Sequence, residues 1–114
     1  MKGPVTSHIL DVSLGRPAQG VPVKLMKRSS QGSFEAVGEG VTNSDGRVSG
    51  LVEAGAFHPG IYSIFFDTGA YFAARGGESF YPEVTIVFEV KATTEHYHVP
   101  LLLSPFGYST YRGS

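Results

Sequence analysis

Cysteine is absent from this chain, which excludes disulfide bonds and every reaction that depends on a thiolate. An excess of one charge is absent too: the formal net charge is −1 at pH 7, and no block of like charges occurs. The chain therefore offers no electrostatic basis for binding nucleic acid or an anionic membrane. No apolar run approaches the roughly 20 residues of a membrane-spanning helix.

The short motifs that mark several common enzyme sites are also missing. The chain has no Gly-x-Ser-x-Gly elbow, no phosphate-binding loop and no His-Glu-x-x-His helix motif. A catalytic site in this protein would therefore have to be assembled from residues that are distant in the sequence.

What the chain does contain favours strands. Its 114 residues correspond to one domain, 1–114, and include 15 glycines and 7 prolines beside many aromatic and β-branched residues. This composition is typical of many short strands joined by tight turns. Alternating apolar residues predict strands over 5–12, 21–27, 34–41, 48–52, 61–67, 84–90, 96–103 and 108–111.

A single short helix is predicted over residues 68–78. Asp67 or Thr68 can cap its start, and Gly76-Gly77 is expected to end it. Residues 14–17 are predicted to form a loop, and Asn43-Ser44-Asp45-Gly46 a turn, because Gly tolerates the left-handed conformation that such turns need. Each predicted sheet has an apolar face to bury, so the fold class is expected to be all-β, a β-sandwich.

The last predicted hairpin carries the most informative side chains. Within its first strand, Tyr97, Val99, Leu101 and Leu103 alternate with His96, His98, Pro100 and Leu102. The first set is apolar and is predicted to face the core. The histidines then lie together on the opposite face.

Taken singly, each candidate functional residue has an ordinary alternative. His96 and His98 could bind zinc if His8 or a carboxylate supplied a third ligand, but histidines at such positions are more often surface or packing residues. His8 is more often a packing residue, Arg47 a solvated charge and Tyr111 a covering aromatic; His58 reads as a loop residue. If they converge, imidazole, guanidinium and phenol groups suit hydrolysis of a small, polar, planar amide.

Several separated segments resemble one known family. The segments are Ser7-His8-Ile9-Leu10-Asp11 with 15–18, Thr42-Asn43-Ser44-Asp45-Gly46-Arg47, Phe80-Tyr81-Pro82, and the C-terminal run from Tyr97 to Ser114 that ends Tyr111-Arg112-Gly113-Ser114. Together they resemble the 5-hydroxyisourate hydrolases, the transthyretin-related proteins, over essentially the whole chain.

The resemblance implies a transthyretin-like β-sandwich of two four-stranded antiparallel sheets with one short helix after the fifth strand. It implies a homotetramer with sites in a central channel, and hydrolytic ring opening of 5-hydroxyisourate in urate degradation without a metal or organic cofactor. The catalytic residues implied are His8, Arg47 and His98, and the substrate-binding residues are Tyr111, Arg112, Gly113 and Ser114. The family motif does not require His96, which is expected at the rim.

Two alternatives stay open at this point. Transthyretin, the thyroid-hormone carrier, shares the fold and the C-terminal hairpin, but lacks the histidines and the arginine at these places and has a tail that runs on past the tyrosine. A generic sandwich module for protein contacts is the third reading. The chain shows no signal peptide and no Ser-Lys-Leu ending, so we expect a cytoplasmic location, with peroxisome and periplasm left open because family members occur in both.

Overall fold

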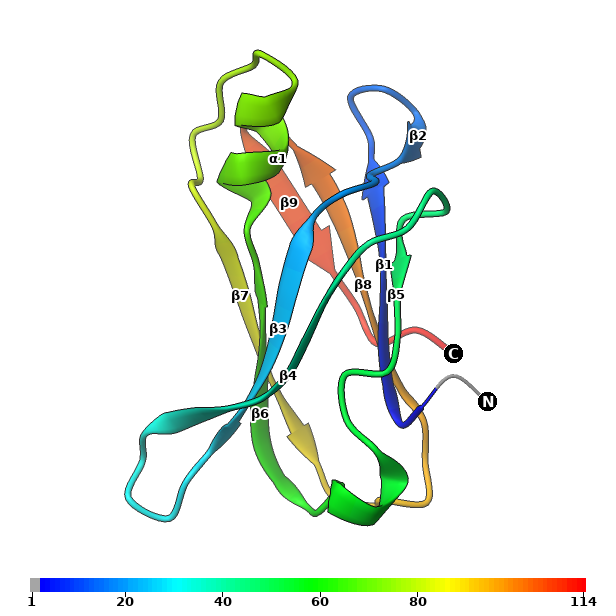
Figure 1. The fold of residues 1–114 in the computed structure, drawn as a ribbon, viewed down its shortest axis with the longest axis vertical. Helices are drawn as coiled ribbons and strands as arrows, with labels where there is room; N and C mark the ends of the chain where they lie inside the picture. The colour runs from blue at the N-terminus through cyan, green and yellow to red at the C-terminus, as the bar shows by residue number, and fades with distance from the viewer. Residues whose placement is uncertain (1–2) are drawn as a thin grey trace.

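Two β-sheets face each other in the computed structural model, which describes residues 3–114 (Figure 1). Within these residues no helix is long and apolar enough to cross a membrane. The elements are β1 Val5–Asp11, β2 Arg16–Pro17, β3 Pro22–Arg28, β4 Phe34–Val41, β5 Arg47–Val48, the 3-10 helix η1 Ala54–Ala56, β6 Gly60–Phe66, α1 Thr68–Ala74, β7 Val84–Val90, β8 Tyr97–Ser104 and β9 Gly107–Thr110.

The sheet composition differs from the prediction of two four-stranded antiparallel sheets. One sheet has the order β4-β3-β6-β7 and is antiparallel throughout, as predicted. The other has five strands, in the order β2-β1-β8-β9 with β5 also paired to β1, and its β1 and β8 run parallel. Most of the chain lies between β1 and β8, so no tight hairpin forces the two strands to run in opposite directions.

The inward faces of the two sheets form the core. The predicted alternation in β8 is confirmed, since Tyr97, Val99, Leu101 and Leu103 are all buried. Residues of β1, β3, β6 and β7 meet them from both layers, among them Val5, Ile9, Val23, Leu25, Tyr62, Ile64, Phe66, Val84 and Val90. The opposite faces of β1 and β8 therefore do not face this core.

Helix α1 is shorter than predicted but begins and ends by the expected means. The Asp67 carboxylate accepts a hydrogen bond from the Ala70 N–H and caps the first turn. Gly76 has a φ of +74°, and the Gly77 N–H donates to the Phe72 carbonyl. The helix therefore ends at Ala74, four residues before the predicted end, because the chain already turns away at Gly76.

Two further strand predictions were wrong in extent. The run predicted over 48–52 pairs only at Arg47–Val48, after which the chain leaves β1 and crosses toward β4. There the Leu51 carbonyl oxygen lies so close to Gly38 that a Cβ on Gly38 would be 1.9 Å away. Residues 14–17, predicted as loop, include the short strand β2, which pairs with the end of β1.

A buried carboxylate ties α1 to the end of β1. Asp11 accepts hydrogen bonds from the Ser13 and Leu14 N–H groups and the Ser13 hydroxyl, and its other oxygen accepts from the Tyr71 hydroxyl at 2.7 Å. Burial alone would raise the pKa of Asp11, but the hydrogen bonds from Ser13, Tyr71 and Leu14 together lower it. Burial and the contact with Asp11 raise the pKa of Tyr71 to about 12.

Removing the Tyr71 hydroxyl from this cluster should lower the stability of the fold, by an amount that depends on pH. We expect Tyr71→Phe to lower the free energy of unfolding at pH 7 by about 1.5–3 kcal/mol, the usual worth of a hydrogen bond to a charged group. Folding lowers the pKa of Asp11. The stability that the ionised Asp11 carboxylate contributes is therefore present above the pKa of the unfolded state and is lost as the pH falls through the pKa of the folded state. Denaturant unfolding should therefore show a smaller difference in unfolding free energy between the wild type and Tyr71→Phe at pH 3 than at pH 7. Tyr81→Phe, which alters an exposed tyrosine, serves as the control.

Candidate active site

Two adjacent rows of paired residues cross the outer face of the five-stranded sheet. In the first row His8 on β1 pairs with Arg47 on β5 and with Pro100 on β8. In the second row Thr6 pairs with His98, and His98 pairs in turn with Gly113. Directly paired residues project to the same face about 5 Å apart, so the register gathers groups from four distant segments.

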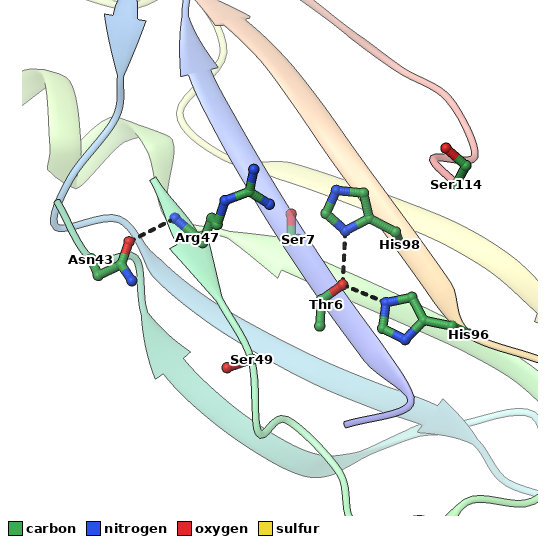
Figure 2. Close-up of a pocket in the computed structure, with 8 residues that line it drawn as sticks. All are labelled: Thr6, Ser7, Asn43, Arg47, Ser49, His96, His98 and Ser114. Carbon is green, nitrogen blue, oxygen red and sulfur yellow. Dashed lines mark hydrogen bonds between the residues drawn. The ribbon is translucent and has the colours of Figure 1, made fainter. Parts of the chain in front are cut away.

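A pocket of about 310 Å³ opens on this face. In Figure 2 the Arg47 guanidinium lies at one edge of β1 and the His96 and His98 imidazoles lie at its other edge, with Ser114 farther out on the C-terminal segment. The residues that line the pocket are Thr6, Ser7, Asn43, Arg47, Ser49, His96, His98 and Ser114. Each of these residues has a polar side chain, and three of them are cationic or can exchange protons, which suits a small polar ligand.

The turn before β5 places Arg47. The Asn43 side-chain oxygen accepts hydrogen bonds from the backbone N–H groups of Asp45 and Arg47, and Gly46 adopts the predicted left-handed conformation with a φ of +73°. The Gly46 carbonyl then accepts from the Ile9 N–H, which fastens the turn to β1. The guanidinium therefore emerges from a fixed backbone although its side chain is exposed.

The Thr6 hydroxyl lies between the two histidines. Its oxygen is 2.9 Å from His96 Nε2 and 2.7 Å from His98 Nδ1. The two rings are nearly parallel, with centroids 6.4 Å apart and an interplanar angle of 24°. His96, which was expected at the rim, is thus half-buried and joined to His98.

His98 sits in an electropositive setting. Burial lowers the pKa of His98 below its usual value, and the electrostatic influence of Arg47, His96 and His8 lowers it further. At neutral pH the ring is therefore uncharged and can exchange hydrogen bonds in either direction.

Removing the charge of Arg47 should show how strongly it affects the pKa of His98. We expect Arg47→Gln to raise the pKa of His98, because removing a positive charge makes the protonated ring less unfavourable. The measurement is an NMR titration of the His98 ring signals in both proteins. Arg28→Gln, on the opposite sheet, is the matched control, and an unchanged or lowered pKa in Arg47→Gln would contradict the expectation.

The C-terminal segment contacts the site through Gly113 and Ser114. The Gly113 N–H donates to the His98 carbonyl at 2.8 Å, so the segment continues along β8. A Cβ on Gly113 would lie 2.5 Å from His98 Cδ2, which means that the imidazole packs directly against the glycine. Ser114 then reaches the pocket itself.

Tyr111 and Arg112 lie elsewhere within one chain. Both line a second hollow together with Ile86 and Phe88, and His98 borders this hollow as well as the first. The Arg112 guanidinium bonds Glu95 at 2.8 Å and stands 4.5 Å from the centre of the Tyr97 ring. Thus, of the seven predicted site residues, Arg47, His98 and Ser114 line the first pocket, His8 and Gly113 adjoin them, and Tyr111 and Arg112 do not reach it.

A zinc site, considered as one reading of His96 and His98, has no third ligand in place. Among residues 3–114 no three His, Cys, Asp or Glu side chains are grouped so as to hold a metal ion. The ring nitrogens that face each other are both engaged by Thr6.

The sequence analysis did not predict Thr6, Ser7, Asn43 and Ser49 as residues of the pocket. For Thr6 a signal existed: it stands two residues before His8 and so shares its strand face. Asn43 belonged to a recognised turn but was read as a turn residue alone, and Ser49 carries no local signal.

Comparison with known proteins identifies the family. The family model described as HIUase/Transthyretin family matches residues 5–113. This chain belongs to the HIUase/Transthyretin family. The resemblance drawn from the motifs is thereby confirmed.

Relatives of this chain include both 5-hydroxyisourate hydrolases and transthyretins. The 5-hydroxyisourate hydrolase of Mus musculus is 46% identical over 112 residues, covering 97% of this chain and 95% of the mouse protein. The structure of Klebsiella pneumoniae 5-hydroxyisourate hydrolase superimposes with a TM-score of 0.83 at 39% identity, covering 96% of this chain and 98% of the other. Sea bream transthyretin in complex with thyroxine gives a TM-score of 0.92 at 33% identity, covering 96% and 94%.

These likenesses confirm the transthyretin-like β-sandwich. Backbone superposition does not distinguish the two kinds of relative, since the transthyretin has the higher TM-score and the hydrolase the higher identity. The side chains on the outer face of the five-stranded sheet must therefore decide between them.

Proposed function

We propose that this protein is a hydrolase that opens the six-membered ring of 5-hydroxyisourate, the compound for which its relatives are named. The observation that carries the proposal is the pocket itself. Arg47 and His98 face the same small polar cavity, and His8 is paired directly with Arg47. No single segment of the chain supplies this combination of an imidazole base and a guanidinium beside a ligand-sized space.

The chemistry follows from those groups. The oxygen of a water molecule bonds to a ring carbonyl carbon while a histidine, His8 or His98, takes up the proton. Arg47 stabilises the oxyanion that forms on the carbonyl oxygen. The ring C–N bond then breaks, the nitrogen receives the proton that the histidine took up, and the product is 2-oxo-4-hydroxy-4-carboxy-5-ureidoimidazoline, in a route of urate degradation. The reaction needs only water, a base and a hydrogen-bond donor to the oxyanion, so the proposal includes no metal or organic cofactor.

The test is ring opening of freshly prepared 5-hydroxyisourate, followed by its ultraviolet absorbance. The purified protein should accelerate the decay of the substrate well above the spontaneous rate, and Arg47→Ala should remove most of the acceleration. Decay at the spontaneous rate in the presence of the wild-type protein would overturn the proposal.

We also propose a homotetramer in which neighbouring subunits complete the sites. Strands β9 and β7 are each at the edge of a sheet and lie on the same side of the molecule (Figure 1). Apolar side chains are exposed along them, among them Val87, Tyr108 and Tyr111. Open edges with apolar side chains favour pairing with another chain.

The assembly is tested by light scattering coupled to size-exclusion chromatography. The expected mass is about four times the 12.2 kDa of one chain. A monomer at micromolar concentration would contradict the assembly and would leave Tyr111 and Arg112 without a route to the pocket.

A thyroxine carrier is the second candidate, because the backbone superimposes closely on transthyretin in complex with thyroxine. The polar lining of the pocket, with Arg47 and two imidazoles, opposes it, since a large iodinated aromatic needs apolar walls. Calorimetric titration with thyroxine distinguishes the two: saturable binding without turnover of 5-hydroxyisourate would favour the carrier.

A further inference from the structure

Thr6 and His96, two side chains that the proposed mechanism does not use, form a continuous hydrogen-bonded chain with His98, one of the proposed catalytic groups. Thr6 is 8% exposed, and its hydroxyl contacts His96 Nε2 on one side and His98 Nδ1 on the other. The parallel pairing of β1 with β8 puts Thr6 directly opposite His98, so the contact is fixed by the sheet (Figure 2).

The protons in this chain can be counted. The Thr6 hydroxyl carries one proton, so it can donate to one of the two rings and must accept from the other. Two neutral arrangements are then possible. In one, His96 donates through Nε2 and Thr6 donates to His98 Nδ1; in the other, both directions are reversed.

The far side of His96 decides between them. His96 Nδ1 is buried and has no hydrogen-bond partner among residues 3–114. The reversed arrangement would put a proton on that nitrogen and leave a buried N–H unpaired, which is unfavourable because the N–H has lost its hydrogen bond to water. Buried N–H groups without a partner are rare, whereas an unused acceptor is tolerated more readily. The first arrangement is therefore favoured, with the His96 proton on Nε2.

We infer that Thr6 is a positioning residue that links His96 to His98 and holds the neutral His98 ring with its proton on Nε2. Figure 2 shows this second ring nitrogen on the side of His98 that faces Arg47. The Nε2–H then points into the pocket as a hydrogen-bond donor beside the guanidinium.

The consequence for the reaction rests on the proposed function, whereas the proton arrangement does not. A His98 ring that donates from Nε2 has no lone pair to offer to water. It joins Arg47 in stabilising the oxyanion, and the water-activating role falls to His8. The choice between the two histidines, which the residues alone left open, is thus made by Thr6 and by an unpartnered nitrogen of His96.

The decisive measurement is the long-range ¹H–¹⁵N NMR spectrum of the histidine rings in ¹⁵N-labelled protein at pH 7.5, which separates the two neutral tautomers. Wild-type His98 and His96 should both carry the proton on Nε2. Thr6→Val removes the hydroxyl at nearly constant shape and should give His98 a mixture of tautomers. Thr6→Ser should restore the wild-type pattern, and Thr85→Val, an exposed threonine on β7, is the control.

Turnover adds a second readout. We expect Thr6→Val to lower kcat about tenfold with KM changed less than about twofold, because the His98 ring is held less firmly but substrate contacts remain. Thr6→Ser should recover most of kcat.

The outcomes separate the two proposals. A wild-type His98 with its proton on Nδ1 overturns the inference even if turnover is high, and so does a Thr6→Val spectrum identical to that of the wild type. The Nε2–H form without any turnover of 5-hydroxyisourate overturns the proposed function and supports the proton arrangement. If Thr6→Val does not fold, the wild-type spectrum still decides.

Discussion

His98→Ala should lower kcat/KM for 5-hydroxyisourate by about 10²–10⁴-fold, the range that a positioned proton-transfer or hydrogen-bonding group contributes. The ring lines the pocket and is held by the Thr6 hydroxyl on one edge and by Gly113 against its other side. Alanine removes both ring nitrogens and with them the contact to Thr6. Initial rates of ultraviolet absorbance decay across a range of substrate concentrations give the measurement.

The fold should tolerate this substitution, because the side chain of His98 is on the outer face and only half-buried. The circular dichroism spectrum and the melting temperature are therefore expected to stay close to those of the wild type. His58→Ala, a histidine exposed on the loop before β6, is the matched control and should keep full turnover. Wild-type rates in His98→Ala would remove this residue from the proposed site.

Gly113→Ala should lower kcat/KM by about 10²-fold, although it adds one methyl group to a residue with no catalytic atoms of its own. The new Cβ would lie 2.5 Å from His98 Cδ2 and 3.2 Å from Pro100 Cγ. The proline ring is rigid and the His98 ring is held by Thr6, so either the imidazole or the C-terminal segment must move. A displacement of about an ångström at a reacting group is enough for a loss of this size.

The control for this substitution is Gly55→Ala, at a glycine whose added Cβ would meet no atom within 4 Å. That variant should match the wild type in turnover and stability. A structure of Gly113→Ala would show which part moves. Full activity in Gly113→Ala would mean that the contact with His98 is not needed in catalysis, whereas loss of activity in both variants would point to a general loss of folding.

The glycine illustrates what local pattern can and cannot predict. The terminal Tyr111-Arg112-Gly113-Ser114 run was expected to bind substrate, and all four residues were treated alike. In the structure these residues have different surroundings. Ser114 lines the pocket, Gly113 packs against His98, and Arg112 contacts Glu95 and the Tyr97 ring. The ladder with β8 is interrupted here because Pro100 has no N–H to donate, so the segment is not held as a regular strand.

The sequence by itself determined the longer strands, the turn before Arg47 and the division of β8 into a buried face and a histidine face. These features depend on neighbours along the chain, through the two-residue period of a strand and the conformational freedom of Gly46. Only the tertiary structure decided that β1 runs parallel to β8 and so sets Thr6 opposite His98. That pairing joins residues about ninety positions apart, and its register depends on how two sheets bury their apolar faces together, which no local pattern records.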